Sequence, residues 1–302
     1  MIDRSDKIFI ASMLLPTFFF IIFFYGYPTV FNLYNSFTDL TLLNLRDGGG
    51  YVGLENYQTL FQNRNFSTTL WNTVFWLTAL PIVIRLILGF GLALVLNADV
   101  IRRYKLTTFT RVCLIVPWAT PPIVAVVTWR WLLDGSVGAV NTFLLDWGLI
   151  NEPIAFLANP DFVWPSLVLI MVWNTLPFVT ITFLAALQSV PKELMEAAEV
   201  DGASYLNRLK HVVMPHMKPT FVVMTLMLIF FSFNNFVYVW LATGAGPGLM
   251  TNVLATEIYI RAFVDLNLGL SSAVGMVMAA FMMVVTFFYY RQVAARQFKD
   301  LF

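Results

Sequence analysis

The stretch EAAEVDGASYLNRLKHVVMP, residues 196–215, is a charged segment set between two long apolar segments. Pro191 precedes it and can begin a helix, because a proline in the first helical turn removes no intrahelical hydrogen bond. Glutamates then recur at every third position beside small apolar residues, which predicts a short helix with an acidic side and a small apolar side. Gly202 should end that helix, since glycine readily takes the left-handed conformation of a sharp stop. A second helical piece is expected over about 204–213.

The composition around this stretch is that of a membrane protein. The chain is 59% hydrophobic and 12% charged, whereas soluble domains are about half apolar and a quarter charged. Continuous apolar runs recur at close to the ~20 residues that a helix needs to cross a bilayer. The predicted fold is an all-α polytopic membrane protein, one domain over residues 1–302, with six transmembrane helices at about 8–30, 69–97, 109–132, 164–188, 220–241 and 271–290.

The lysines and arginines predict the orientation of these helices. Both termini, the 98–108 loop and the 189–219 loop are assigned to the cytoplasm, because cytoplasmic loops carry an excess of basic residues. Counting Arg111, which lies near the cytoplasmic end of the third span, the assignment places 13 of the 18 basic residues on that side: Arg4, Lys7, Arg102, Arg103, Lys105, Arg111, Lys192, Arg208, Lys210, Lys218, Arg291, Arg296 and Lys299. No basic stripe indicates nucleic acid as a partner, and membrane lipid is the expected environment.

The charged segment also carries a family resemblance. Glu196-Ala197-Ala198, Gly202 and the ending Val212-Val213-Met214-Pro215 closely resemble the E-A-A…G…I-x-L-P loop of permease subunits of bacterial binding-protein-dependent ABC importers. Val212 and Met214 stand where that family has Ile and Leu. In the family this loop is the cytoplasmic coupling segment that docks into an ATPase. The resemblance implies the same role for the 189–219 loop, through Glu196, Ala197, Ala198, Asp201, Gly202, Ala203 and Pro215.

The resemblance extends over most of the chain. Residues 241–247, Thr251 and 269–273 look like the last third of maltose-type sugar permeases, although the long periplasmic insert and extra N-terminal spans of the maltose protein are missing. It implies the type I ABC importer architecture, in the bacterial inner membrane, for a permease that carries a sugar or sugar-like solute into the cytoplasm. It also implies three partners, which are a second homologous permease subunit, an ABC ATPase dimer and an extracytoplasmic substrate-binding protein.

The sequence gives little support to catalysis by this chain. It has no G-x-x-x-x-G-K-[ST] loop to cradle a nucleotide phosphate, so ATP and Mg²⁺ are expected on the partner ATPase and no cofactor here. His211 and His216 are five residues apart, out of step with a helical i, i+4 metal pair, and no metal site is expected. An ion-coupled secondary transporter is the alternative function, but it would use buried acidic residues and internal repeats. A structural or insertion-assisting membrane protein would not need the coupling loop.

Two polar stretches inside predicted spans mark a candidate substrate pathway. Polar groups within a span are costly and usually face a bundle interior or a watery cavity. Each stretch places aromatic rings beside amides and hydroxyls, a combination that suits the C–H faces and the hydroxyls of a sugar. Maltose-type permeases use these stretches for their membrane sugar site, which implies Trp173, Asn174, Thr175, Phe178, Phe231, Ser232 and Asn235 here. The alternative for the asparagines is helix–helix packing through amide hydrogen bonds.

Arg85 lies midway through the second predicted span, where a charge costs about 2.5–3.5 kcal/mol on insertion scales. No carboxylate lies in any of the six spans, so its expected partner is a backbone carbonyl, water, the second permease or a ligand. An acidic sugar is one interpretation, which adds Arg85 to the substrate pathway. Snorkelling of the side chain toward a membrane face is the other.

Overall fold

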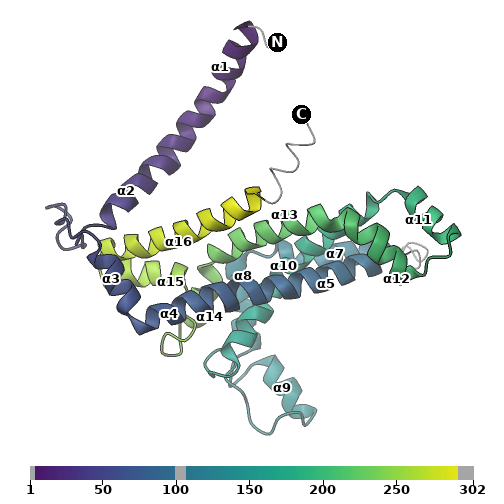
Figure 1. Ribbon diagram of the computed structural model, residues 1–302. Helices are drawn as coiled ribbons and strands as arrows, with labels where there is room; N and C mark the ends of the chain where they lie inside the picture. The colour runs from purple at the N-terminus through teal and green to yellow at the C-terminus, as the bar shows by residue number, and fades with distance from the viewer. Residues whose placement is uncertain (1–3, 99–106, 292–302) are drawn as a thin grey trace. The chain divides into compact units, whose positions relative to one another are not determined.

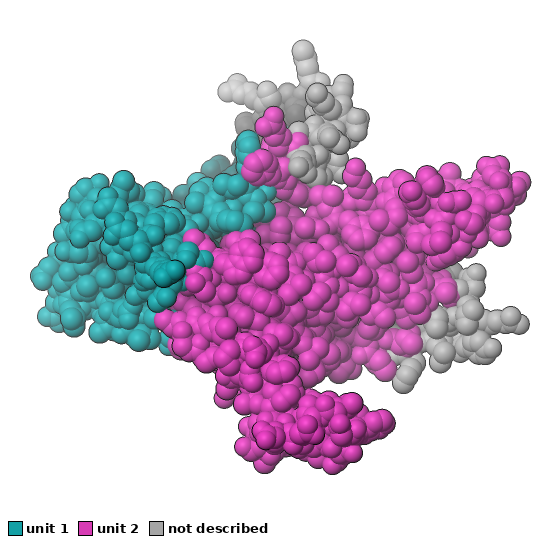
Figure 2. Space-filling view, turned by 60° about the horizontal axis from the view of Figure 1, so that its bottom comes forward, with its two compact units in different colours: residues 1–67, 257–287 teal, residues 68–256, 288–302 magenta. Residues whose placement is uncertain are grey.

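The structure is a computed structural model that describes residues 4–98 and 107–291. Within these ranges the chain is mainly helical, and its only β-structure is two isolated bridges. It divides into two compact units, residues 1–67 with 257–287 and residues 68–256 with 288–302 (Figure 2). Several basic residues predicted to mark the cytoplasmic side lie outside the described residues: Arg102, Arg103, Lys105, Arg296 and Lys299.

The first unit contains the N-terminal and C-terminal long helices. Its elements are α1 (Arg4–Ile21), the π-helical segment η1 (Ile22–Gly26), α2 (Tyr27–Asn35), α3 (Glu55–Gln62), a second π-helical segment η4 (Ile260–Val264) and α16 (Leu268–Tyr289). α1, η1 and α2 form one continuous helical rod (Figure 1), which contains the predicted first span. Large apolar side chains are exposed along most of this rod, as expected of a helix that meets lipid.

The segment between α2 and α3 is fixed by polar side chains of the same unit. The Asn56 Nδ2 donates to the carbonyl oxygens of Ser36 (3.0 Å) and Thr38 (2.8 Å). At the start of α16, the Gly269 N–H donates to the carbonyl of Leu40 at 2.8 Å. A Cβ at Gly269 would lie 2.1 Å from the Thr38 carbonyl oxygen. Glycine is therefore required where α16 begins against this segment.

The second unit contains the remaining helices, arranged around the long α10. Its elements are α4 (Arg64–Trp71, beginning in the first unit), η2 (Asn72–Ala79), α5 (Leu80–Asn97), α7 (Thr107–Ala119), α8 (Pro122–Leu132), α9 (Ala139–Asp146), α10 (Val163–Gln188), α11 (Lys192–Val200), α12 (Tyr205–Arg208), η3 (Leu209–Val213), α13 (Met214–Phe233), α14 (Val237–Thr243) and α15 (Leu254–Tyr259, ending in the first unit). α5 and α10 pack closely, because a Cβ at Gly89 would lie 2.8 Å from Val179 Cγ1.

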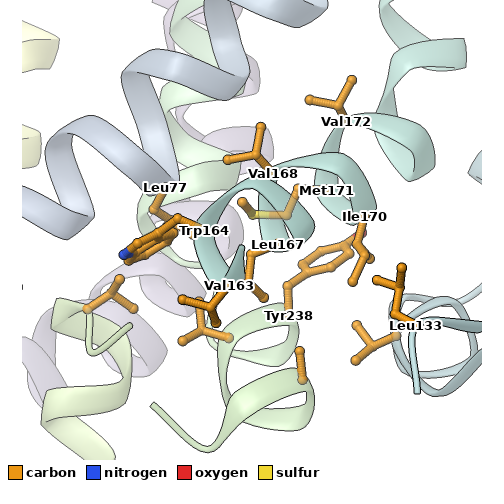
Figure 3. Close-up of a cluster of buried hydrophobic side chains, with 14 residues drawn as sticks. Leu77, Leu133, Val163, Trp164, Leu167, Val168, Ile170, Met171, Val172 and Tyr238 are labelled. Carbon is orange, nitrogen blue, oxygen red and sulfur yellow. The ribbon is translucent and has the colours of Figure 1, made fainter. Parts of the chain in front are cut away.

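The buried apolar side chains of the second unit form two clusters along α10. One joins the first half of α10 to α14, and the Tyr238 ring lies in it beside Ile170 (Figure 3). The other joins the second half of α10 to α5 and α13 around Phe183. α10 thus supplies core residues on both sides of Asn174, which places that polar side chain in the middle of the unit.

The predicted class of fold is confirmed. Within the described ranges, five helices are long and apolar enough to cross a membrane, and a bent pair makes a sixth if it counts as one span. The five are Phe9–Asn35, Arg64–Asn97, Val163–Gln188, Tyr205–Phe233 and Leu268–Tyr289. They contain the first, second and sixth predicted spans almost whole and coincide with the fourth within a residue or two.

The third predicted span, over 109–132, is a bent pair of helices in the structure. The helix breaks after Ala119 and resumes at Pro122, with a bend of 97° between α7 and α8. Pro121 has ψ 139°, an extended conformation, which is expected because the residue before a proline is disfavoured in the helical region. The adjacent prolines were a readable signal for this break.

The fifth span also differs from its prediction. α12, η3 and α13 form one helix over Tyr205–Phe233, so the expected separate helix over 204–213 continues into the span. The helix then breaks at residues 234–236, inside the predicted 220–241. Prolines explain the first difference, since Pro28, Pro81 and Pro215 each stand two residues after a π-helical segment. A π turn shifts the hydrogen-bond register, which lets a helix accommodate a residue without an N–H.

Candidate functional site

The turn at Gly202 is a Schellman motif at the end of α11. The Gly202 N–H donates to the Glu199 carbonyl at 3.0 Å, and the Ala203 N–H donates to the Ala198 carbonyl at 2.9 Å, the bond pair that defines the motif. Gly202 has φ +74°, a conformation that costs other residues about 1–2 kcal/mol. A Cβ there would meet no atom within 4 Å. The requirement for glycine at this turn is therefore conformational rather than steric.

Residues 191–213, which comprise α11, this turn, α12 and η3, form the coupling hairpin. Figure 1 shows α11 and α12 together at one end of the second unit. Of the predicted coupling residues, Glu196, Ala197, Asp201, Gly202 and Pro215 are exposed, and Ala198 and Ala203 are partly buried. Val200 and Leu206 are 89% and 73% exposed. Large apolar side chains presented at a rigid turn are suited to contact with a protein partner.

An ion pair holds the two helices of the hairpin together. The Arg208 Nη1 donates to the Glu199 Oε2 at 2.6 Å, and the two side chains are 19% and 68% exposed. A pocket of about 610 Å³ lies between the hairpin and the ends of α5 and α10, lined in part by Asn97, Gln188 and Met195. The Ser204 hydroxyl also accepts from the Asn207 N–H at 3.4 Å, capping α12. The hairpin is thus a locally braced element.

Three aromatic rings from separate helices form a platform beside the bend in the third span. Trp118 of α7 stacks on Phe178 of α10 with ring centroids 5.8 Å apart, and Phe178 meets Phe231 of α13 edge to face at 6.4 Å. Trp118 and Phe231 are 52% and 54% exposed. Phe178 and Phe231 were predicted site residues, and the structure brings them together. Trp118 was missed, although Pro117-Trp118 before two further prolines could have indicated a broken helix carrying an aromatic ring.

Asn174 lies behind this platform and uses its polar atoms within the protein. Its Nδ2 donates to the carbonyls of Pro117 (2.6 Å) and Thr120 (3.1 Å), at the bend between α7 and α8. The Tyr238 hydroxyl of α14 donates to the Asn174 Oδ1. These bonds are those of a packing residue that ties three elements together. A contact between Asn174 and substrate stays a prediction.

The remaining predicted pathway residues are divided between exposed and buried positions. The Asn235 Oδ1 accepts from the Tyr238 N–H at 3.4 Å and so caps α14, while its half-buried Nδ2 has no hydrogen bond within the described residues. Ser232 is buried one turn earlier. Thr175 donates to the Met171 carbonyl at 2.7 Å. Trp173 packs edge to face on Trp129 at 5.7 Å, away from the ring platform.

Arg85 is buried within the second unit, with 3% of its surface exposed. Its Nε has no hydrogen-bond partner among the described residues. Ile84, its neighbour in α5, packs against the apolar cluster that contains Tyr238. The side chain therefore does not snorkel to a membrane face in this structure. Arg85, Asn174 and Tyr238, with Thr78 of η2, form the buried polar cluster.

The described residues hold no group of three or more His, Cys, Asp or Glu that could bind a metal ion. What the arrangement offers is an accessible ring platform, the Asn235 amide one turn after Phe231, a buried charged group at Arg85 and a braced hairpin at one end of the unit. Rings can stack on C–H faces and the amide can bond to hydroxyls, while the hairpin presents a surface to another protein. These are chemical features suited to recognition of a solute and of a protein partner.

Comparison with known proteins gives a family match over most of this unit and beyond. Residues 86–297 match the family described as the inner membrane component of binding-protein-dependent transport systems. The chain is 32% identical over 290 residues to the sulfoquinovosyl glycerol transport system permease SmoG of Agrobacterium fabrum, covering 96% of this chain and 92% of that protein. It is 33% identical over 240 residues to the trehalose/maltose transport system permease MalF of Thermococcus litoralis, covering 78% and 77%.

A solved structure has the same fold. The chain superposes with a TM-score of 0.81 on a crystal structure of a bacterial ABC transporter involved in the import of the acidic polysaccharide alginate, covering 95% of each chain at 23% identity. At that identity the likeness concerns the fold alone. The long helices and the bent pair described above are therefore an architecture found in an ABC importer.

Proposed function

This chain belongs to the inner membrane components of binding-protein-dependent transport systems and is the permease of a sugar ABC importer, and we propose that its solute passes over the ring platform. The observation that carries this proposal is the stack of Trp118, Phe178 and Phe231, whose outer faces are accessible in the single chain. Aromatic faces bind the apolar C–H faces of sugar rings, while the free Asn235 amide supplies a hydrogen-bond donor for a hydroxyl.

The exposure of the platform bears on the partner permease. An aromatic surface left open in one chain becomes an enclosed cavity when a second chain covers it. We therefore propose a second homologous permease subunit that faces Trp118 and Phe231. The family is defined by dependence on a binding protein, which supports an extracytoplasmic substrate-binding protein as the donor of the solute.

The coupling hairpin supports a proposal for energy coupling. Two ABC ATPase subunits would dock on α11 and the turn at Gly202, and would bind the ATP and Mg²⁺ that this chain has no loop to hold. Because α12 continues through η3 into α13, a movement of the hairpin would be carried along the helix that bears Phe231 and Ser232. ATPases that dock on the hairpin would lie in the cytoplasm, so the proposal places the hairpin and both termini on the cytoplasmic side.

The test is transport by the complete complex in proteoliposomes. Uptake of a radiolabelled sugar should require ATP inside, the binding protein outside and both permeases. Trp118→Ala should lower uptake by about three- to tenfold, because a stacked ring contributes on the order of 0.5–1.5 kcal/mol. The matched control is Trp147→Ala, which removes another exposed ring, packed at a tilt against Phe143 in the α9 region. Equal effects of the two substitutions, or uptake driven by an ion gradient without ATP, would contradict the proposal.

A further inference from the structure

Two buried polar atoms without partners lie on one face of the second span. Only three buried side-chain nitrogen or oxygen atoms in the described residues lack a hydrogen bond, and they include Thr78 Oγ1 and Arg85 Nε. The two residues are seven positions apart in the continuous helix Arg64–Asn97, so they share a face. Native proteins satisfy nearly all such atoms, and each exception requires an explanation.

The charge of Arg85 has no counter-ion within the described part of the chain. None of the three ion pairs described involves it. The long helices and the bent pair contain no aspartate or glutamate between their span limits. A cation that is buried and unpaired is strongly unfavourable, and buried charges are normally paired. The buried polar cluster therefore lacks one negative charge.

The position of the cluster connects it to the proposed pathway. Ile84, next to Arg85, packs against the apolar cluster that contains Tyr238, and Tyr238 donates its hydroxyl to Asn174. Asn174 lies one turn before Phe178 on α10, and it holds the bend that carries Trp118. The Tyr238–Asn174 hydrogen bond thus joins α14 to α10 one turn before Phe178 of the ring platform. If this bond opens, the Tyr238 hydroxyl becomes a free donor.

We propose that Arg85, Tyr238 and Thr78 form the receptor for an acid group on the transported solute, a carboxylate, sulfonate or phosphate carried by a sugar or polyol. The inference rests on the proposed function, since it assumes that the solute reaches the ring platform. The structure described here is the closed form of this receptor. Binding of the acid group favours the form in which Tyr238 and Asn174 separate, because only that form gives the anion access to the cation.

The chemistry of Arg85 suits this role better than that of a neutral residue. A guanidinium binds two oxygens of one oxyanion through parallel N–H donors. Hydroxyls of Thr78 and Tyr238 can each donate a further hydrogen bond. A neutral sugar would gain nothing from the charge, so the site distinguishes solutes by their acid group. Arg85 is in this sense a specificity-determining residue.

The experiment uses pairs of solutes that differ by one acid group, namely glucose with glucuronate and glycerol with glycerol 3-phosphate. Thermal shift of the isolated binding protein first identifies which pair members it binds. Uptake of those members by the complete complex is then measured for wild type, Arg85→Gln and Arg85→Lys. Arg130→Gln is the matched control, because Arg130 is exposed and bonds only to the Leu241 carbonyl among the described residues.

The expected result is that the binding protein prefers acidic members and that Arg85→Gln lowers their uptake at least about tenfold, since a hydrogen bond to a charged group contributes roughly that factor. Arg85→Lys should retain part of the activity, and Arg130→Gln should change it less than about twofold. Neutral members that bind should be unaffected by Arg85→Gln.

Three results would overturn the inference. In the first, the binding protein binds neutral members only. In the second, Arg85→Gln leaves the uptake of acidic members intact. In the third, Arg85→Gln lowers acidic and neutral uptake equally with no change in KM, which is the behaviour of a packing residue. If neutral uptake instead depends on chloride or inorganic phosphate and loses that dependence in Arg85→Gln, the cluster holds a free ion rather than the solute. Failure of wild type to import any sugar would contradict the proposed function and is distinguishable from all of these.

Discussion

The coupling hairpin and the buried polar cluster both contain charged groups. They differ in how far apart along the chain the bonded residues lie. In the hairpin, the bonds that fix the conformation join residues at most nine positions apart, including the Glu199–Arg208 ion pair and the turn at Gly202. In the cluster, Asn174 bonds to residues 54, 57 and 64 positions away. A local device can be moved as a unit by a partner, whereas the cluster changes only when whole helices move apart.

The hairpin, fixed by local bonds, and the cluster, fixed by long-range bonds, are connected through helix α13. The hairpin is exposed and continues through η3 into α13, the helix that carries Phe231. The cluster joins α10, α14 and the bend between α7 and α8. In a transporter that alternates between outward and inward access, one element must transmit the movement and other bonds must break as the helices move. The hairpin is suited to the first role and the interhelical bonds of the cluster to the second. The following substitutions separate the two contributions.

The largest effect is expected from Gly202→Val, which should nearly abolish uptake. Valine at φ +74° is strained by at least 1–2 kcal/mol, and its β-branched side chain makes that conformation still less accessible. The Schellman turn should open and the hairpin should lose its docking geometry. ATPase activity stimulated by the loaded binding protein is the measurement, together with the amount of subunit in the membrane.

The control for this prediction is Gly202→Asn. Asparagine tolerates the left-handed conformation, and a Cβ at this position meets no neighbouring atom within 4 Å. It should therefore retain most of the stimulated activity. Normal coupling in Gly202→Val, in a complex that assembles, would show that the turn has no role in docking the ATPase.

The second effect concerns stability and belongs to the cluster. Asn174→Ala should lower the Tm of the detergent-solubilised complex clearly, because it leaves the Tyr238 hydroxyl without its partner, at about 1–3 kcal/mol for a buried group, and removes the bonds to the Thr120 carbonyl and to the Pro117 carbonyl, which keeps the Thr120 N–H. Tyr238→Phe removes one of these bonds and should cost less. If Asn174→Ala leaves the Tm unchanged but weakens uptake, the substrate contact predicted for Asn174 becomes the better interpretation.

The same contrast separates what the sequence could predict from what it could not. The helix ending at Gly202 followed from residues within one turn of it, because the conformation depends on a glycine and its neighbours. The bend after Ala119 also had a local signal, in Pro121 and Pro122. The stretch around these prolines has the length of one membrane span, so it was predicted as a single helix. Both are backbone properties that adjacent residues determine.

The partners of buried side chains could not be predicted in this way. The sequence placed Asn174 in a span beside Trp173 and Pro177 but contained no indication that its amide meets carbonyls 54 and 57 residues earlier. Trp118 was not selected, since its pairing with Phe178 depends on how α7 packs on α10. The burial of Arg85 likewise depends on helices that surround it. Tertiary packing decides these features.

A smaller effect is expected at Asn235, which lies in the sequence between Phe231 of the platform and Tyr238 of the cluster. Asn235→Ala should lower uptake several-fold, because it removes the free amide donor and also the cap of α14, which contributes about 0.5–2 kcal/mol. Asn235→Ser keeps a capping oxygen but not the amide. If uptake falls equally in both variants while the Tm falls only in Asn235→Ala, the amide acts on the solute. Recovery of uptake in Asn235→Ser would assign the effect to the cap.

The smallest effect is expected from the Glu199–Arg208 ion pair, and it bears on whether the hairpin moves as one body. Each of Glu199→Gln and Arg208→Gln should change the free energy of unfolding by about 0–1 kcal/mol, because Glu199 is largely exposed and exposed ion pairs contribute little. Their effect on coupling should be larger than this, since the pair joins α11 to α12 across the turn. The measurement is the ratio of solute imported to ATP hydrolysed for both single variants and the double variant. An additive loss in the double variant would mean that the two side chains act separately, whereas a double variant no worse than either single variant is the result expected of one brace.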